Sequence, residues 1–404
     1  MSVLIDKLIA ILISLSFLSF LSLLKGGGII LGILVLSIFG LFINQSKNKA
    51  LEKWEKFLLI SYISYFTLAL FNNYIFDGAI SNIDTASRFL LVIPIFFYLR
   101  KSNVPYKSLE YGLILASGIF GINSIFPIFF DFSPIFEFKK HSGIVSLYSS
   151  IIGITCLFLV SRKKSLTYNL FIIICSLGGI FSSLLAGGRG VWIASLFILI
   201  IFFFFNPLRW SKNEIFLTFI FGVIFLSMSF LIPETKIEQR IDRANNEIHS
   251  YIKYGEMSSI GERLEMMKSA LLIIRENPIL GIGEGNFKKE NIKLINNGSI
   301  RSEIRKFNHP HNEYLTTMVE QGLLGLCALL FLFLSPLKKC KEAIKQKHFN
   351  SKINIPIVFT TILILHYLFY SATNGVFDHQ NTTLFFAAFV AIGMGMYSSS
   401  EQIS

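Results

Sequence analysis

Long apolar runs recur through most of this chain, and they limit what it can fold into. About twelve of them are long enough, or nearly so, to cross a membrane as helices. They lie near residues 4–24, 27–43, 57–76, 86–99, 109–130, 143–160, 166–186, 190–205, 214–232, 314–334, 355–373 and 381–397. With 53% hydrophobic and 15% charged residues, the chain lacks the polar side chains that a soluble surface needs. The sequence therefore predicts an all-α integral membrane protein.

Basic residues indicate which side of the membrane each loop occupies. With the N-terminus inside, the cytoplasmic segments carry 19 lysines and arginines, whereas the short outer loops carry five. This asymmetry predicts that both termini are cytoplasmic. It divides the chain into spans one to nine at 1–232, an outer loop domain at 233–313, and spans ten to twelve at 314–404. The net charge of +12 does not indicate nucleic-acid binding, because the basic residues punctuate apolar runs and do not gather on one soluble face.

The stretch Phe307–Gly325, FNHPHNEYLTTMVEQGLLG, presents two histidines just before an apolar run. Pro310 suits the first turn of a helix, which would place His311 in that turn. The positive end of the helix dipole would then lower the pKa of His311 and keep its imidazole neutral, able to accept a proton. A polar cap where a helix leaves the membrane is an equally good interpretation. His309 and His311 have no acidic residue at zinc-protease spacing, and the chain has no DxD triplet, so we predict no metal site.

The seventh and eighth runs are joined outside the membrane by a glycine-rich turn around one arginine, AGGRGVW. Glycines on both sides of Arg189 let the backbone turn tightly and bring the guanidinium and backbone amides close to a ligand, an arrangement suited to phosphate. The alternative is a tight turn with a snorkelling arginine. Because Arg189 lies on the outer side, against the general charge bias, we favour ligand binding.

The outer loop is predicted to contain two helices. The first lies on the membrane or on the helix bundle, and its apolar face carries Ile237, Ile241, Ala244, Ile248 and Tyr251. The second runs from about Ser259 to Glu276 and stops at Asn277-Pro278, with one face formed by Leu264, Met267, Leu271 and Ile274. Arg263 opens this second helix, where the dipole disfavours a cation, so the side chain is either solvated or recruited by an anion.

The rest of the loop is glycine-rich and then basic. Gly281–Asn286 has no preceding strand and no following Lys-Ser/Thr, so a turn that positions the loop beneath the histidines is favoured over a nucleotide loop. Arg301, Arg305 and Lys306 then form either a solvated run or part of an anion site.

Four more ionisable residues lie in or next to the last spans. Glu320 lies about two turns into the tenth span and needs a partner or water, and Glu313 belongs to the same segment. His366 lies inside the eleventh run, where it is a functional candidate or simply hydrogen-bonds a neighbouring helix. Asp378 lies in the last outer loop, on the same side as Arg189 and His311.

Three of these motifs together resemble one family. GGRGVW, ENPILGIGEGNF and HPHNEYLTTMVEQGLLG are similar to segments of the O-antigen ligase and O-antigen polymerase superfamily of Gram-negative bacteria, over roughly Phe181 to Leu334. The spacing from His311-Asn312 across nine residues to Gly322 matches the ligase pattern. About twelve membrane helices with one long periplasmic loop containing amphipathic helices agree with that resemblance.

The resemblance implies a metal-independent, inverting glycosyltransferase of the inner membrane with no cofactor. Such an enzyme moves O-antigen from undecaprenyl diphosphate to a sugar of the lipid A-core on the periplasmic face, among membrane lipids. It implies His311 as the general base and Arg189 and Arg263 as donor-diphosphate ligands. Arg301 and Arg305 are candidates for further cations, and His309 and Asp378 are additional site candidates, although His309 is not the histidine of the pattern.

Two other functions compete with the ligase. An O-antigen polymerase shares the chemistry but joins lipid-linked repeat units, and polymerases commonly carry two substantial outer loops where this chain has one. A transporter would place its polar residues near the bilayer midplane, whereas here the cations gather at the outer boundary. We therefore favour the ligase.

Overall fold

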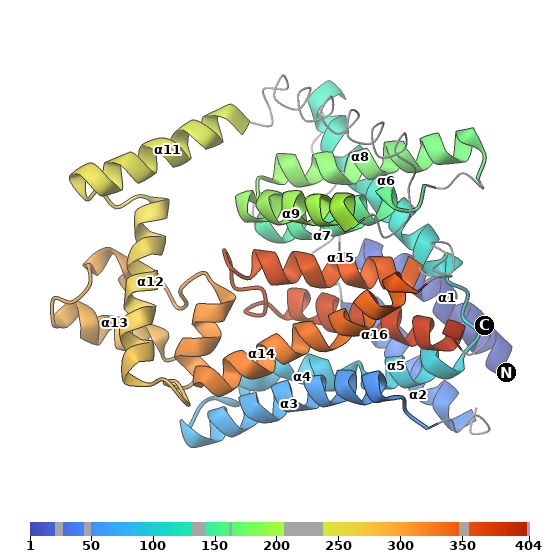
Figure 1. The fold of residues 1–404 in the computed structure, drawn as a ribbon, viewed down its shortest axis with the longest axis horizontal. Coiled ribbons are helices and arrows are strands. Elements are labelled where there is room, and N and C mark those ends of the chain that lie inside the picture. Colours follow the sequence, from blue (N-terminus) through green and yellow to red (C-terminus); the bar gives the residue numbers. More distant parts are fainter. Residues whose placement is uncertain are drawn as a thin grey trace.

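The computed structural model describes residues 1–20, 27–43, 50–130, 142–160, 164–205, 237–346 and 355–401, and every regular element in these ranges is a helix (Figure 1). The predicted all-α class is therefore confirmed for the described residues. The elements are α1 (Ser2–Ser19), α2 (Gly27–Ile43), α3 (Lys53–Ile75), η1 (Ile80–Ile83), α4 (Asp84–Leu91), α5 (Ile93–Lys101), α6 (Lys107–Phe130), α7 (Ser142–Leu157), α8 (Leu166–Ala186), α9 (Arg189–Phe205), α11 (Ile237–Tyr254), α12 (Ser259–Glu276), α13 (Phe287–Asn296), η4 (Ser302–Lys306), α14 (Glu313–Lys345), α15 (Ile355–Tyr370) and α16 (Gln380–Glu401).

Within the described part of the chain, seven helical segments are long and apolar enough to cross a membrane. They are Ser2–Ser19, Lys53–Ile75, Ile80–Lys101, Lys107–Phe126, Leu166–Ala186, Glu313–Lys345 and Gln380–Ser400. Four shorter apolar helices accompany them: Gly27–Ile43, Ser142–Leu157, Arg189–Phe202 and Ile355–Tyr370. The predicted span at 214–232 lies outside the described residues.

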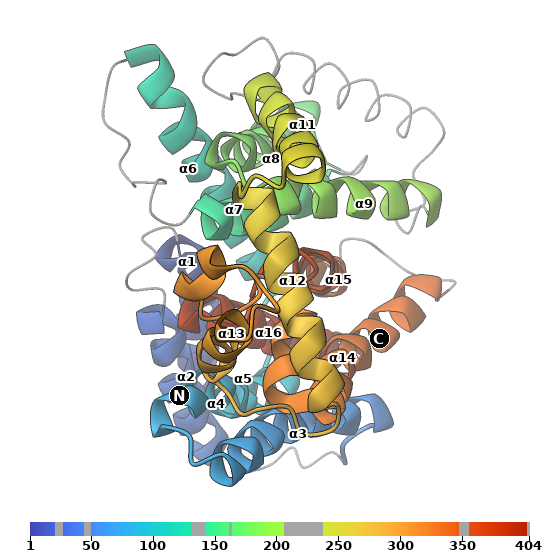
Figure 2. The same cartoon turned by 90° about the vertical axis from the view of Figure 1, so that its left-hand side faces the viewer.

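The apolar helices form a bundle, and the loop helices α11, α12 and α13 gather at one of its ends, away from both chain termini (Figure 1). Figure 2 looks onto this end and shows α12 crossing it, from the side of α8 and α9 to the side of α3 and α14. α12 contacts α11 at its start and packs against α14. Its bounds, Ser259–Glu276, are those predicted from the sequence, because Ser258 caps its start and Pro278 follows its end.

The face of α12 that packs inward is not the face of the predicted apolar stripe. Met266, Ala270 and Ile273 are buried, whereas Leu264, Met267 and Leu271 are exposed, Leu271 at 58%. On α11, which forms a helix where one was predicted, Ile241 and Ile248 are also exposed. Both loop helices therefore present apolar side chains on their outer surfaces.

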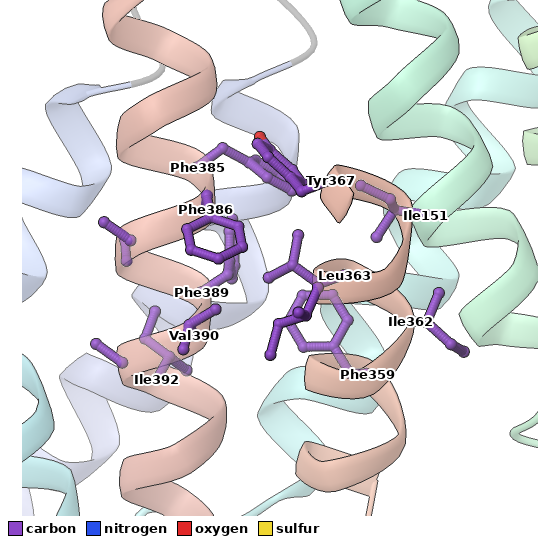
Figure 3. Close-up of a cluster of buried hydrophobic side chains, with 14 of the residues drawn as sticks. Ile151, Phe359, Ile362, Leu363, Tyr367, Phe385, Phe386, Phe389, Val390 and Ile392 are labelled. Atoms are coloured by element: carbon purple, nitrogen blue, oxygen red, sulfur yellow. The ribbon is translucent and has the colours of Figure 1, made fainter. Parts of the chain in front are cut away.

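The centre of the bundle is built from the last two helices. In α16, 94% of the residues in its apolar stretch are buried, and the side chains of α15 are buried along most of that helix. Aromatic rings fill the space between them (Figure 3): Phe389 stacks on Phe17 of α1 at 4.3 Å and meets Phe359 of α15 edge-on at 5.7 Å. Helices that are apolar on all sides are expected at the core of a bundle. α15 and α16 therefore form a central frame that holds the short loop joining them, residues 371–379.

His366 of α15 belongs to this frame. Its Nε2 lies 3.1 Å from the Ser150 hydroxyl and 3.3 Å from the Ser195 hydroxyl, and its Nδ1 lies 2.9 Å from the Ile362 carbonyl. The side chain is fully buried. Of the two interpretations offered for His366, the structure therefore supports a hydrogen bond between helices.

α14 is interrupted at Gly322, where φ is 64° and ψ is −159°. A helix leaves backbone groups without partners at such a break, and inside a membrane each one must be satisfied by the protein. The loop segment from Pro278 to Gly283 supplies these partners. The N–H groups of Leu323 and Leu324 donate to the carbonyls of Pro278 and Ile279 at 2.9 and 3.5 Å.

The same segment also satisfies the other side of the break. The N–H groups of Ile282 and Gly283 donate to the carbonyls of Val319 and Glu320, both at 2.9 Å. Asn72 of α3 donates to the carbonyls of Leu280 and Glu320 at 2.9 and 3.1 Å. The predicted glycine turn is present, and it fits into the broken part of the helix that follows the histidines.

Candidate active site

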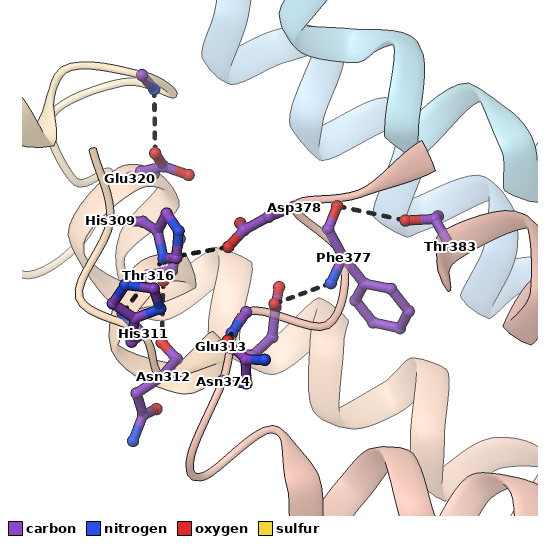
Figure 4. Close-up of polar contacts among 12 residues, drawn as sticks. His309, His311, Asn312, Glu313, Thr316, Glu320, Asn374, Phe377, Asp378 and Thr383 are labelled. Atoms are coloured by element: carbon purple, nitrogen blue, oxygen red, sulfur yellow. Dashed lines mark hydrogen bonds and ion pairs between the residues drawn. The ribbon is translucent and has the colours of Figure 1, made fainter. Parts of the chain in front are cut away.

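His309, His311 and Glu313 lie against the loop between α15 and α16, residues 371–379, which carries Asp378 (Figure 4). The Glu313 N–H donates to the carbonyls of Ser371 and Asn374 at 2.8 and 3.1 Å. The Glu313 carboxylate accepts from the Phe377 N–H at 3.0 Å, and the Asn312 side chain donates to the Ala372 carbonyl at 2.9 Å. The start of α14 is thus fastened to this loop from both sides.

His311 does not lie in the first turn of a helix, as the sequence predicted, but two residues before one. α14 begins at Glu313, and Asn312 is its N-cap, with a side-chain oxygen that accepts from the Leu315 N–H at 3.1 Å. Asparagine is a far better cap than proline or histidine, so it sets the helix start and overrides the preference of Pro310 for a first turn. His311 instead has a positive φ of 52°, and its N–H donates to His309 Nδ1 at 3.2 Å.

The His311 imidazole is half-buried between other rings. It meets the His309 ring at 4.3 Å and the Phe307 ring at 5.5 Å, both nearly edge-on. Burial lowers the pKa of His311, the neighbouring His309 lowers it further, and the positive charge of Arg263 acts in the same direction. A hydrogen bond from His311 to Asn374 and the charge of Asp378 oppose these effects.

The lowered pKa was predicted, but its main cause was not. Desolvation and the neighbouring histidine dominate, in place of the helix dipole that the sequence suggested. The imidazole is therefore neutral at neutral pH. The hydrogen bond to Asn374 engages one side of the ring and leaves the other available to accept a proton.

His309 and Asp378 form the second contact of the site. His309 Nδ1 lies 3.2 Å from Asp378 Oδ2, and the two side chains are 27% and 22% exposed. Desolvation lowers the pKa of His309 and raises the pKa of Asp378. Both shifts disfavour an ion pair, and His309 Nδ1 already accepts from the His311 N–H, so the contact is a close approach of the imidazole to the Asp378 carboxyl group.

Arg189 is placed by the turn that the sequence identified. α8 ends at Ala186, Gly187 takes a left-handed φ of 83°, and α9 begins at Arg189. A Cβ added to Gly190 would lie 3.2 Å from Cδ2 of Tyr370 and 3.0 Å from Cβ of Thr373. The glycine therefore lets α9 approach the end of α15, which leads directly into the 371–379 loop.

Arg263 lies in the second turn of α12, near the end of that helix that lies on the side of α9, which begins at Arg189. Desolvation lowers the pKa of Arg263, and the next cause is the positive charge of Arg189. Arginine remains protonated at physiological pH even so. Neither guanidinium has an ion pair with any residue that the structure describes. The charge of Glu247 acts on Arg263 without forming an ion pair, and the two repelling arginines form a site suited to an anion.

Arg301 and Arg305 are placed differently. Arg301 donates to the Gly255 carbonyl, lies 6.0 Å from the Tyr251 ring, and has a backbone N–H bonded to Glu265 at 3.0 Å. These contacts fasten the junction of α11 and α12. Arg305 is exposed within η4. These contacts of Arg301 include neither His309 nor His311.

Three residues of this end escaped the sequence reasoning. Asn374 hydrogen-bonds His311 and donates through Nδ2 to the Tyr370 hydroxyl at 2.6 Å. In the glycine turn, desolvation and then Asp378 raise the pKa of Glu284 to about 7. Asn374 lies in the polar stretch SATNGVFDH after the eleventh apolar run, the same stretch from which Asp378 was predicted as a site residue.

Glu320 has the partner that its position in a span requires, because its carboxylate accepts from the Gly285 N–H at 3.0 Å (Figure 4). The acidic side chains at this end do not form a metal site: among the described residues, no group of three or more His, Cys, Asp or Glu side chains is arranged to hold an ion.

Comparison with known proteins identifies part of the chain. Residues 171–330 match the protein family described as O-antigen ligase, so the chain carries an O-antigen ligase family domain. The O-antigen ligase of Escherichia coli K12 is 27% identical over 115 residues, which cover 28% of this chain and 27% of that protein. An uncharacterized protein of Haemophilus influenzae is 28% identical over 388 residues, which cover 94% of this chain and 95% of that protein. The family domain includes Arg189, Arg263 and His311.

Proposed function

We propose that this chain, through its O-antigen ligase family domain, is a metal-independent, inverting glycosyltransferase. It transfers O-antigen polysaccharide from undecaprenyl diphosphate to a sugar hydroxyl of the lipid A-core. The observation that carries the proposal is that the charge of Arg263 interacts with both Arg189 and His311: two cations for a diphosphate and one neutral base for a hydroxyl.

The proposed reaction uses each of these groups once. His311 takes the proton of the acceptor hydroxyl as that oxygen attacks the anomeric carbon of the donor's first sugar. The bond between that carbon and the diphosphate oxygen breaks, and its electron pair leaves with the diphosphate. Arg189 and Arg263 neutralise the charge that develops there. Attack opposite the leaving group inverts the configuration of the anomeric carbon.

The proposal includes a placement in the membrane. We propose about twelve spans in the bacterial inner membrane, including one at 214–232, with both termini cytoplasmic and the site facing the periplasm. The site lies where α8 and α15 end and α9 begins. The opposite end holds Arg100, Lys101 and the lysines at the end of α14, consistent with the positive-inside rule.

Substitution tests the roles of the residues. His311→Ala, Arg189→Ala and Arg263→Ala, each expressed in a strain deleted for the gene, are expected to reduce transfer at least about 100-fold, as loss of a general base does. Lipopolysaccharide laddering on gels is the measurement, and membrane insertion should be unchanged. His249→Ala on α11 and Arg275→Ala in the last turn of α12 are matched controls that should retain the ladder.

The deletion strain itself tests the reaction. A ligase defect leaves polymer on undecaprenyl diphosphate and bare lipid A-core, whereas a polymerase defect sends single repeat units to the core. The second pattern would replace the ligase by the polymerase, and a ladder retained in His311→Ala would contradict the assigned base.

A further inference from the structure

A cavity of about 390 Å³ lies between helix ends and is separate from the site described above. It is lined by the start of α6, the start of α8, the residues after α7 and the first residue of α15. α8 leads from here to Arg189, and α15 leads from here to Tyr370, so the cavity lies at the opposite end of the bundle from His311. Its volume is within the range of small-ligand sites, about 300–1,000 Å³.

The cavity has a charged wall that is already ordered. Lys164 forms an ion pair with Glu110, and its ammonium also lies 4.6 Å from the centre of the Tyr168 ring. The Tyr168 hydroxyl donates to the same Glu110 oxygen at 3.1 Å. Glu110 comes from α6 and Tyr168 from α8, two helices that pack closely, and Lys164 lies just before the start of α8. An ammonium has three N–H donors, so Lys164 can donate to a second acceptor while its carboxylate holds it in place.

The charge in the cavity favours an anion. Lys107 and Lys164 outnumber Glu110, and Lys107 is exposed and makes no ion pair with any described residue. α6 and α8 also begin at the cavity, so the positive ends of both helix dipoles point toward it. Lysine point charges combined with helix N-termini are groups that bind phosphate.

The surroundings of the cavity favour a lipid as the source of that phosphate. Phe158, Leu159 and Ile355 form a buried apolar floor. From the opening, α6 exposes Tyr111, Leu115 and Ile122 along one side, and α8 exposes Leu166, Leu170 and Ile174. Tyrosines at a helix end mark the head-group level of a bilayer, and the apolar side chains beyond them face its hydrocarbon.

We propose that this cavity binds the phosphate of an anionic phospholipid head group, with the acyl chains lying along the exposed faces of α6 and α8. Basic pockets between membrane helices on the cytoplasmic side bind such head groups in other proteins. On the topology proposed above, the lipid comes from the cytoplasmic leaflet. The site does not depend on the transferase activity.

Native mass spectrometry of the full-length protein tests the proposal. The protein in detergent is mixed with phosphatidylglycerol and phosphatidylethanolamine, and the lipid that remains bound is counted. Retention of phosphatidylglycerol should exceed that of phosphatidylethanolamine, and Lys107→Glu should reduce it at least about fivefold, the effect of one lysine at a membrane surface. Lys56→Gln, an exposed lysine in the first turn of α3, is the matched control and should change nothing.

Lys107 is substituted in preference to Lys164, because Lys164→Gln would leave the buried Glu110 carboxylate without its ion pair. Equal retention of the two lipids, or unchanged retention in Lys107→Glu, would overturn the site. A second experiment measures the thermal unfolding temperature of the protein in phosphatidylcholine, with inorganic phosphate or with phosphatidylglycerol added. Stabilisation by phosphate as large as that by phosphatidylglycerol would overturn the assignment to a lipid.

Discussion

His311 has a backbone conformation that few residues other than glycine adopt. A positive φ of 52° costs a residue with a side chain about 1 kcal/mol. Here the bond from its N–H to His309 and the cap that Asn312 provides to α14 maintain it. The conformation turns the imidazole out of the path of the helix and toward the loop at 371–379, where Asn374 holds one side of the ring.

The charge state of His311 leads to a prediction about pH. Its pKa lies below the ordinary histidine value of 6.5, so the imidazole stays neutral at pH 7 and becomes protonated only as the pH falls further. Arg263→Gln removes a positive charge that holds this pKa down, so the titration should move to higher pH.

The titration can be measured without activity. Diethylpyrocarbonate modifies only neutral imidazole, so its rate at His311, followed by peptide mass spectrometry from pH 5 to 8, gives the midpoint in active and inactive variants alike. Arg275→Gln on the same helix is the control and should leave the midpoint unchanged. An unchanged midpoint in Arg263→Gln would show that the two side chains do not interact.

The sequence revealed the site residues that lie in short polar motifs between apolar runs. Arg189, Arg263 and His311 could be selected in this way, and the structure brings them to one end of the bundle. Tyr370 could not, because it ends an apolar run and its importance depends on which helices α15 packs against. No local pattern contains that information.

Among the elements, α14 shows how far a helix can depend on a segment that is remote in sequence. Its break at Gly322 is stable because the backbone between Pro278 and Gly283 satisfies both sides of it. The sequence identified Gly322 as part of a motif and Gly281–Asn286 as a turn. It could not pair them, since a glycine inside an apolar run is equally compatible with an unbroken helix.

The break predicts a difference between two glycine substitutions. Gly322 and Gly298 both have positive φ, but a Cβ at Gly322 would collide with the backbone of Ile279, whereas a Cβ at Gly298 meets nothing. Gly322→Ala should therefore lower the free energy of unfolding by about 3 kcal/mol or more, since backbone cannot move aside. Gly298→Ala should cost about 1 kcal/mol.

Thermal unfolding of the purified proteins in detergent measures both. Equal unfolding temperatures for the two variants would mean that α14 can close its break without the loop.

At the scale of the whole molecule, the charge asymmetry of the loops and the direction of the helices agree. α14 has 33 residues from Glu313 to Lys345 and, at about 1.5 Å per residue, is long enough to cross a bilayer. Its start belongs to the site, and its end carries the lysine cluster. The apolar runs could be located from the sequence because each is long and uniform. The placement of α15 and α16 at the centre could not, since most of the other runs are just as apolar.

This geometry predicts which positions can be labelled from outside. Ser302→Cys, in η4, should react with a membrane-impermeant maleimide in cells whose outer membrane has been permeabilised, because the loop is expected in the periplasm. Lys341→Cys, near the end of α14, should react only after the inner membrane is opened. Labelling of both positions from the same side would contradict the proposed topology.

The hydrogen bonds from the loop to the break in α14 also constrain how the protein is synthesised and inserted. Ile279 leaves the ribosome well before Leu324, the residue whose amide donates to its carbonyl. Until that bond forms, the second half of α14 would enter lipid with unsatisfied amides at its leading end. On the proposed topology, insertion of this helix is therefore coupled to folding of a loop that has already been exported.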